Sequence, residues 1–360
     1  MVDHRLHPDS ARWTDGAEAH ARRVGAESVR LSWQGDKPTT GLPEAARSAR
    51  HRLIANAARA RGVRVVLFGH TADDAAENLW MRAEGVPLGR LQPWSPSPVW
   101  PEGRGVFVLR PLLHAARAEL RTLLRDRGVE WLDDPANTDL RFARVRARRA
   151  LDGGPAHIAA GPACSTDAPQ WTERWSAVRL PRDAAIDEAR LSALLVCVAG
   201  GERPPRSAAL ARLLARWRDG GDFTATLSGA RVEAAGDEVQ VTREPGRRGL
   251  QSLPLAAGGE AVWDGRFLVR TQASGASVRP LAGLAARLSR DDARRLREAP
   301  ASARATLPAF VDADGRVTCP LLDPQEGPHQ AISLVGARLH AAWGGVRRES
   351  DITAPSLLAR

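Results

Sequence analysis

The chain has 360 residues, enough for two or three domains of about 100–200 residues each. Hydrophobic residues make up 43%, which excludes an intrinsically disordered chain, and no apolar run approaches the ~20 residues of a transmembrane helix. Lysine and arginine outnumber aspartate and glutamate by 52 to 42, and the resulting charge of +10 favours a polyanionic partner, nucleic acid before an anionic membrane. Because Lys37 is the only lysine, a compositional bias of the genome could also produce this excess.

The first 130 residues alternate between strand and helix patterns. VRVVLFG at 63–69 is a nearly continuous apolar run, typical of a buried parallel strand, and Gly62 ends the helix before it. We expect further strands at 29–33 and 107–113, and helices at 10–24, 42–61, from about 72, and 115–128. This order predicts an α/β domain built on a parallel sheet.

Two linker-like stretches divide the rest of the chain. GGPAHIAAGPACSTDAPQ follows the first domain, and EPGRRGLQSLP lies at 244–254. Between them we expect helices at 183–200 and 207–218, followed by strands. Beyond them, Asp264-Gly265 and Asp314-Gly315 predict hairpin turns on either side of a helix near 289–298. The expected domains are 1–151, a helical and β-hairpin domain at 152–250, and a small α+β domain at 251–360.

The cysteines and the N-terminus indicate the cell compartment in which the protein is expected. Cys164, Cys197 and Cys319 are isolated and form no CxxC pair, so we expect neither disulfides nor a structural zinc site. MVDHRLHPDS contains no apolar signal-peptide core. We therefore expect a cytoplasmic protein with no membrane association.

The stretch GHTADDAAENLW places four polar side chains after the apolar run. His70, Asp73, Asp74 and Glu77 have the i, i+3, i+4, i+7 spacing of one helix face. Acidic residues at the carboxyl end of a parallel strand can bind Mg²⁺ or an ammonium group, and a neighbouring histidine can exchange a proton with an amine. The same letters also fit a capping box from Thr71 to Asp74, and the spacing alone does not separate the two interpretations.

A second cluster lies in DDPANTDLRFARVRARRAL. It holds five arginines, namely Arg141, Arg144, Arg146, Arg148 and Arg149. Guanidinium forks suit phosphate oxygens, although a solvated helix face is the commoner explanation of such a run. The Asp/Asn/Pro turn before the helix favours phosphate binding, because its short polar side chains would fix a loop against that helix. Arg110, after the strand at 107–113, is a further phosphate candidate.

Taken in order, these stretches resemble the tRNA(Ile)-lysidine synthetase family of the PP-loop ATP-pyrophosphatase superfamily. The matching segments are VDHRLHPDS, GDKPTTGLPEAARSARHRL, GHTADDAAENLWMR, RPLL with R-x-EL, and W-x-DDPANTDLRFARVRAR. TLSGARV, VTREPGR and VWDGRF are similar to the family's downstream domains with lower specificity. The resemblance implies an adenine nucleotide alpha hydrolase-like parallel-sheet domain followed by two smaller domains, of which the C-terminal one contacts tRNA.

The resemblance also implies a ligase reaction. ATP adenylates the wobble cytidine of an isoleucine tRNA with a CAU anticodon, and the side-chain amine of free lysine then replaces AMP at C2. His70, Asp74 and Glu77 match catalytic positions, and Asp73 and Arg110 match substrate or nucleotide positions. The tRNA-contacting positions are Asn137, Asp139, Arg144, Arg146 and Arg148. ATP and Mg²⁺ are the implied co-substrate and metal, and a homodimer is left open.

This sequence departs from the family pattern at its start. The family's phosphate-cradling SGGxDS loop does not occur in the 360 residues, and Met1 falls where the family's second strand is ending. We therefore expect an N-terminally incomplete sheet with apolar edges, and a gene product heavier than the 38.8 kDa of this chain. The alternatives are a non-catalytic tRNA-binding remnant and, ranked lower because no CxxC is present, another PP-loop enzyme such as a tRNA thiolase.

Overall fold

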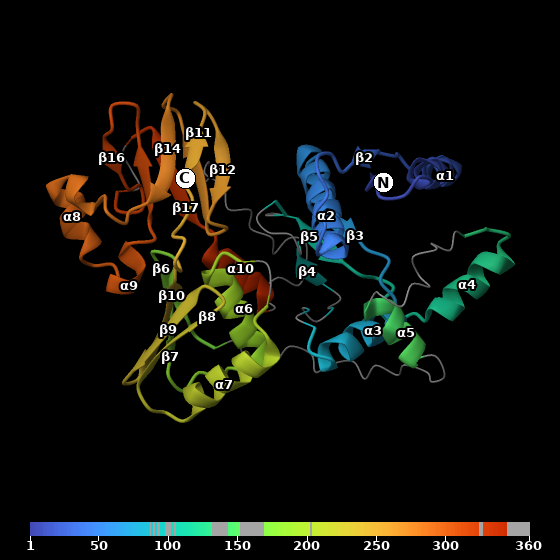
Figure 1. Cartoon of the computed structure of the whole chain (residues 1–360), viewed down its shortest axis with the longest axis horizontal. Helices are drawn as coiled ribbons and strands as arrows, with labels where there is room; N and C mark the ends of the chain where they lie inside the picture. Colours follow the sequence, from blue (N-terminus) through green and yellow to red (C-terminus); the bar gives the residue numbers. More distant parts are fainter. Residues whose placement is uncertain are drawn as a thin grey trace.

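A computed structural model describes residues 1–86, 88, 91, 94–97, 102–103, 106–131, 143–151, 169–201, 204–323 and 327–343. Figure 1 shows an N-terminal region that carries α1 to α5 beside two further regions built mainly on antiparallel sheets. Within the described ranges, no helix has both the length and the apolarity to cross a membrane.

The N-terminal region has the expected alternation of strands and helices. Its elements are β1 (Val2–Asp3), α1 (Ser10–Arg23), β2 (Leu31–Ser32), α2 (Leu42–Ala60), β3 (Val65–Leu67), α3 (Ala72–Ala83), β4 (Trp94–Pro96), β5 (Phe107–Leu109), α4 (Arg117–Asp126) and α5 (Ala143–Leu151). Strand β3 pairs with β5 in parallel, so the residues after both strands leave the sheet at the same edge. That edge carries the candidate site.

The sheet differs from the single parallel sheet that the sequence predicts. Strands β1 and β2 form a parallel pair of their own, and the second sheet has the order β3-β5-β4 with β4 antiparallel to β5. Among the described residues no strand joins β1 to β3, so β3 is an edge strand. Its Leu67 side chain is 65% exposed. The expectation of an exposed apolar edge is thus confirmed for β3.

The second region is an antiparallel sheet covered by two helices. It contains β6 (Thr172–Arg174), β7 (Ala177–Pro181), α6 (Glu188–Val198), α7 (Ser207–Arg218), β8 (Phe223–Leu227), β9 (Ala230–Ala235) and β10 (Glu238–Arg243), with strand order β6-β7-β10-β9-β8. Helix α7 has the predicted bounds because Leu210, Leu213, Leu214 and Trp217 form a stripe buried against this sheet.

The third region contains two small sheets. Its elements are β11 (Leu253–Leu255), β12 (Glu260–Trp263), β13 (Phe267–Thr271), β14 (Ala276–Pro280), a 3₁₀ turn (Ala285–Arg287), α8 (Arg290–Leu296), α9 (Ala301–Arg304), β15 (Pro308–Val311), β16 (Val317–Thr318), β17 (His329–Ser333) and α10 (Val335–Ala342). The sheets have the orders β11-β14-β15-β16 and β12-β13-β17. Both predicted Asp-Gly hairpins are present, joining β12 to β13 and β15 to β16.

The last helix connects the regions. Val335, Leu339 and Trp343 lie in the hydrophobic core of the second region, where the Trp343 indole donates to the carbonyl of Arg190 at 3.1 Å. Helix α10 also lies against β4 of the N-terminal region, so the end of the described chain contacts all three parts (Figure 1).

Candidate active site

The site begins where β3 and β5 end. His70 follows β3 and Arg110 follows β5, and parallel pairing brings their side chains together, with Arg110 Nε donating to His70 Nδ1 at 3.3 Å. Arg110 is only 5% exposed. Burial, and next the positive charge of Arg47, lower the pKa of Arg110 to about 10. The guanidinium is charged at neutral pH although it is almost completely removed from water.

The hydrogen bond from Arg110 fixes the chemistry of His70. Since Nδ1 accepts, a neutral ring carries its proton on Nε2, which can donate to a ligand. Burial and the charge of Arg110 lower the pKa of His70 to about 4. The ring is therefore neutral at physiological pH and suited to donating a hydrogen bond rather than to acting as a cation.

The spacing of the four residues predicted His70 on the same helix as Asp73, Asp74 and Glu77. This prediction is wrong, because His70 lies before the helix. Helix α3 starts at Ala72, and Thr71 is its N-cap, with the Thr71 backbone N–H donating to Asp74 Oδ2 at 2.7 Å and the Asp74 N–H to Thr71 Oγ1 at 3.4 Å. This is a capping box, so the prediction from the sequence that Asp74 caps the helix with Thr71 is confirmed. His70 is held by the strand end instead.

The two aspartates serve different parts of the site. Asp73 Oδ2 accepts from the backbone N–H of Arg117 at 2.7 Å and so fixes the first residue of α4. Burial would raise the pKa of Asp74, but the Thr71 N–H and the charge of Arg144 outweigh it and hold that pKa below its usual range. Asp74 therefore remains an anion with an oxygen turned toward the arginines.

Glu77, one turn further along α3, is the centre of an ion-pair cluster. It is 1% exposed and accepts from Arg144 Nε at 2.7 Å, from Arg148 Nε at 2.9 Å and from Arg117 at 3.1 Å. Arg144 and Arg117 also contact Asp74, so each guanidinium bridges both carboxylates. The predicted i,i+4 partners on the arginine helix thus face the acidic pair, and α5 packs directly on α3.

The other predicted site residues stand as follows. Arg146 is exposed on α5, two residues from Arg144 and away from the acidic pair. Asn137 and Asp139 lie outside the described residues. Sequence reasoning did not assign a role to Arg117, although the R-x-EL signature placed it at the start of a helix and could have identified it.

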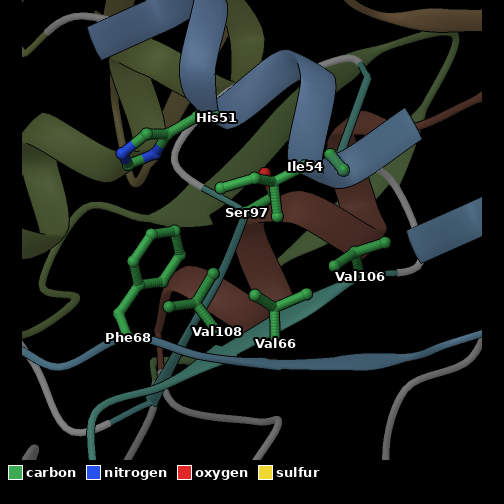
Figure 2. A pocket seen from close by; sticks show the side chains of 8 residues that line it. His51, Ile54, Val66, Phe68, Ser97, Val106 and Val108 are labelled. Carbon is green, nitrogen blue, oxygen red and sulfur yellow. The ribbon is translucent and has the colours of Figure 1, made fainter. Parts of the chain in front are cut away.

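A short stack of rings joins this cluster to α2. His51 stacks on Phe68 with ring centroids 5.0 Å apart, and Phe68 lies 5.7 Å from His70. Figure 2 shows His51 and Phe68 on one side of a small apolar cavity between α2 and the sheet. Its volume of about 10 Å³ has room for about one water molecule, so this cavity is not a nucleobase pocket.

The acidic side chains of the site are poorly suited to a metal ion. Among the described residues no three His, Cys, Asp or Glu side chains form a group that could hold one. The oxygens of Asp74 and Glu77 already accept from guanidinium groups, and hard cations such as Mg²⁺ require free carboxylate oxygens. These residues therefore do not fit a magnesium site.

Arginine exceeds acid throughout this part of the protein. Within the described residues, the guanidinium groups of Arg117, Arg144 and Arg148 contact two carboxylates, those of Asp74 and Glu77, and Arg110 lies beside them at His70. A partly buried cluster with more guanidinium groups than carboxylates favours polyanions such as a triphosphate or an RNA backbone. The acidic pair within it would suit an ammonium group if one guanidinium moved aside.

Comparisons with known proteins show which family the chain resembles in sequence. Residues 1–152 match the PP-loop domain family. The chain is 46% identical to a tRNA(Ile)-lysidine synthase of Caulobacter vibrioides over 97% of this chain and 86% of the relative. It is 35% identical to a tRNA(Ile)-lysidine synthase of Hyphomonas neptunium, over 68% of this chain and 73% of the relative. It is 34% identical to one of Mesorhizobium japonicum, over 90% and 77%.

Proposed function

This chain belongs to the tRNA(Ile)-lysidine synthase family, and we propose that it is the ligase that joins lysine to the wobble cytidine of an isoleucine tRNA with a CAU anticodon. In this reaction the O2 of the cytidine attacks ATP and releases pyrophosphate. The side-chain amine of free lysine then attacks C2, and AMP leaves with the oxygen. The product is lysidine.

The single observation that carries the proposal is the acidic pair inside an arginine cluster at the carboxyl edge of the parallel strands. Asp74 and Glu77 bind cationic groups from three arginines, which supports their use as the site for the lysine side chain. In the working complex the lysine nitrogen would take the place of one guanidinium. Since Asp74 is held as an anion by the Thr71 cap, the pair would orient the amine for attack.

His70 has a different proposed role from that of a general base. With its pKa at about 4, the ring takes up a proton poorly at neutral pH. Its Nε2–H is directed by the Arg110 bond on the opposite nitrogen and can donate to an oxygen of the nucleotide or of the cytidine. Arg110 would add a fixed positive charge beside that oxygen, where negative charge develops during adenylation.

The arginines of α5 have the proposed role of phosphate ligands. Arg144 and Arg148 are half-buried and can exchange one carboxylate oxygen for a phosphate oxygen without losing charge-assisted hydrogen bonds. Such an exchange would free Asp74 and Glu77 for lysine. ATP as co-substrate fits the surplus of positive charge, while Mg²⁺ has no ligand set among the described residues.

The test is ATP-dependent attachment of labelled lysine to tRNA, with the protein purified from its own cells. The substrate is a CAU-anticodon isoleucine tRNA, and the matched control is the same tRNA with the wobble cytidine replaced by uridine. We expect incorporation with the first and none with the second. Tight binding of the tRNA without incorporation would refute the ligase proposal and favour the tRNA-binding remnant. Sedimentation of the same preparation would decide whether the protein is a homodimer.

A further inference from the structure

Arg117, the first residue of α4, binds the acidic pair through a single nitrogen. Its Nη2 donates to Glu77 Oε1 at 3.1 Å and to Asp74 Oδ1 at 3.5 Å. Among the described residues, Nε and Nη1 of the same guanidinium make no hydrogen bond. Arg144 differs, because it binds the two carboxylates with separate nitrogens, Nε and Nη2. Arg117 therefore places one positively charged NH₂ group between Asp74 and Glu77.

The contacts of Arg117 with the acids duplicate those of other arginines. Glu77 Oε1 also accepts from Arg148 Nε at 2.9 Å, and Asp74 Oδ1 also accepts from Arg144. If the Arg117 side chain turned away, both oxygens would keep a charged donor, so neither carboxylate would be left with an oxygen that lacks a partner. Arg117 is thus the guanidinium whose departure disturbs the acidic pair least.

The main chain of Arg117 is held independently of its side chain. Its N–H donates to Asp73 Oδ2 at 2.7 Å, and the N–H of Ala72 donates to the carbonyl of Ala115 at 3.0 Å. All ten residues of α4 are described and none is buried, and Figure 1 shows the helix extending away from α3 and α5. The side chain of Arg117 can therefore turn toward water while the start of α4 stays bound to α3.

Helix stability does not explain an arginine at this position. The first turn of a helix carries partial positive charge, so a guanidinium there is unfavourable and an acidic side chain is favourable. Glu119, in the same turn, has the favourable charge and accepts from the N–H of Ala116 at 2.8 Å. The side chain of Arg117 therefore serves the acidic pair rather than its own helix.

The position of Nη2 suits a primary ammonium group. An ammonium is a compact charge with three donors, so one nitrogen can bind two carboxylates at once, as the Nη2 of Arg117 does. A guanidinium more often binds through a fork of two nitrogens, as Arg144 does. The single-nitrogen contact between Asp74 and Glu77 is thus the contact that a lysine side chain would make.

We propose that the guanidinium of Arg117 occupies the place of the lysine ammonium in the free protein and is displaced by that ammonium when lysine binds. The inference rests on the proposed function, because it takes lysine as the ligand of Asp74 and Glu77. Competition makes Arg117 a specificity-determining residue, since a ligand must bring its own positive charge to replace the contacts that Arg117 loses. Norleucine, which has the carbon chain of lysine without the side-chain amine, cannot replace them.

Calorimetry with the full chain, with ATP present and tRNA absent, tests the competition. Binding of lysine and norleucine is compared for wild type, Arg117→Gln and the matched control Arg125→Gln, which removes the same charge from an exposed position of α4. Loss of the competitor should strengthen lysine binding by about three- to fivefold, as expected for a partly exposed ion pair. Arg125→Gln should change it by less than about 1.5-fold, because solvent screens its charge. Equal or weaker lysine binding by Arg117→Gln would overturn the proposal.

Chemical labelling distinguishes displacement from a change of charge alone. Phenylglyoxal modifies accessible guanidinium groups, and peptide masses locate the modified arginines. The Arg117 side chain is 27% exposed while it contacts the acids, so its displacement by saturating lysine should raise its labelling severalfold. Norleucine at the same concentration should have no effect. Unchanged labelling of Arg117, or its protection by lysine, would overturn the proposal.

Thermal unfolding and lysine incorporation separate the remaining outcomes. Because both acidic oxygens keep another arginine, the melting temperature of Arg117→Gln should lie within about 3 °C of that of wild type. A larger fall together with weaker lysine binding would make Arg117 a structural support of the acidic pair and would overturn the proposal.

The proposed function and the displacement can fail separately. If lysine raises the labelling of Arg117 but is not joined to tRNA by wild type, the ligase function is wrong and the displacement stands. Incorporation by wild type with unchanged labelling removes only the displacement. If neither wild type nor variant binds lysine, both are wrong.

Discussion

Replacing Glu77 by glutamine tests the acidic cluster directly. The substitution keeps the size of a side chain that is 1% exposed but removes its charge. Three guanidinium groups then lose their shared carboxylate, and the amide nitrogen of the substituted side chain cannot accept from any of them. At least one charge-assisted bond disappears and the others weaken to charge-neutral bonds.

The size of the effect follows from these contacts. Breaking a fully buried ion pair costs about 3–5 kcal/mol. Arg117, Arg144 and Arg148 remain 27–42% exposed and can turn partly to water, which reduces the cost. We therefore expect a loss of about 2–3 kcal/mol in the free energy of unfolding of the N-terminal region. Helix α5 should suffer most, since α3 is its main packing partner.

Chemical denaturation combined with hydrogen exchange measures both quantities. The matched control is Glu84→Gln at the C-terminal end of the same helix, where the side chain is exposed and neutralisation should change stability by less than about 0.5 kcal/mol. Amides of 143–151 should lose protection only in the Glu77 variant. If that variant is as stable as the control and α5 keeps its protection, the carboxylate does not hold the arginine helix.

Three further predictions concern other positions. Gly265→Ala should destabilise by about 2 kcal/mol more than Gly258→Ala in thermal unfolding, because both have left-handed backbones but only at Gly265 would a Cβ collide with the carbonyl of Gly200; equal losses would contradict this. Burial lowers the pKa of His51 to about 3, whereas the same side chain in the unfolded chain has a pKa of about 6.5. As the pH falls below about 6.5, the unfolded chain therefore binds a proton that the folded chain does not, and the free energy of unfolding declines by about 2 kcal/mol at pH 5. His51→Phe should remove this part of the decline of the melting temperature with falling pH. If the melting temperatures of wild type and variant fall in parallel between pH 6.5 and 5, the prediction is wrong. Burial raises the pKa of Cys319 to about 12, so iodoacetamide at pH 8 should label it only after denaturation, as peptide masses would reveal.

Much of the secondary structure was predictable where local rules decide it. Helix α7 was predicted at its observed bounds because its apolar stripe has helical spacing, and the turn at Asp264 and Gly265 adopts φ values of 51° and 65°, as Asp-Gly hairpins do. Helix α10 was not predicted. Its apolar residues are buried by a region more than 100 residues away in sequence, and no local pattern reports such a partner.

The site was predictable in composition more than in arrangement. The spacing of His70, Asp74 and Glu77 indicated one helix face, but the Thr71 cap starts the helix after His70. Arg144 and Arg148 were identified from their run, while their carboxylate partners depend on packing between helices about 70 residues apart.

The capping and functional interpretations of Asp74 turn out to be compatible. The Thr71 N–H and hydroxyl bind one carboxylate oxygen, Oδ2, and leave Oδ1 facing Arg144 and Arg117. The cap thus fixes the orientation of the carboxylate and stabilises its charged form, and both are requirements for binding a cation. A local helix signal and a binding residue therefore share one side chain because the hydrogen bonds that start the helix also preorganise the anion. Glu77 has no such cap, and its position depends on the arginines, so ligand exchange in this cluster should begin at Glu77 while Asp74 stays in place.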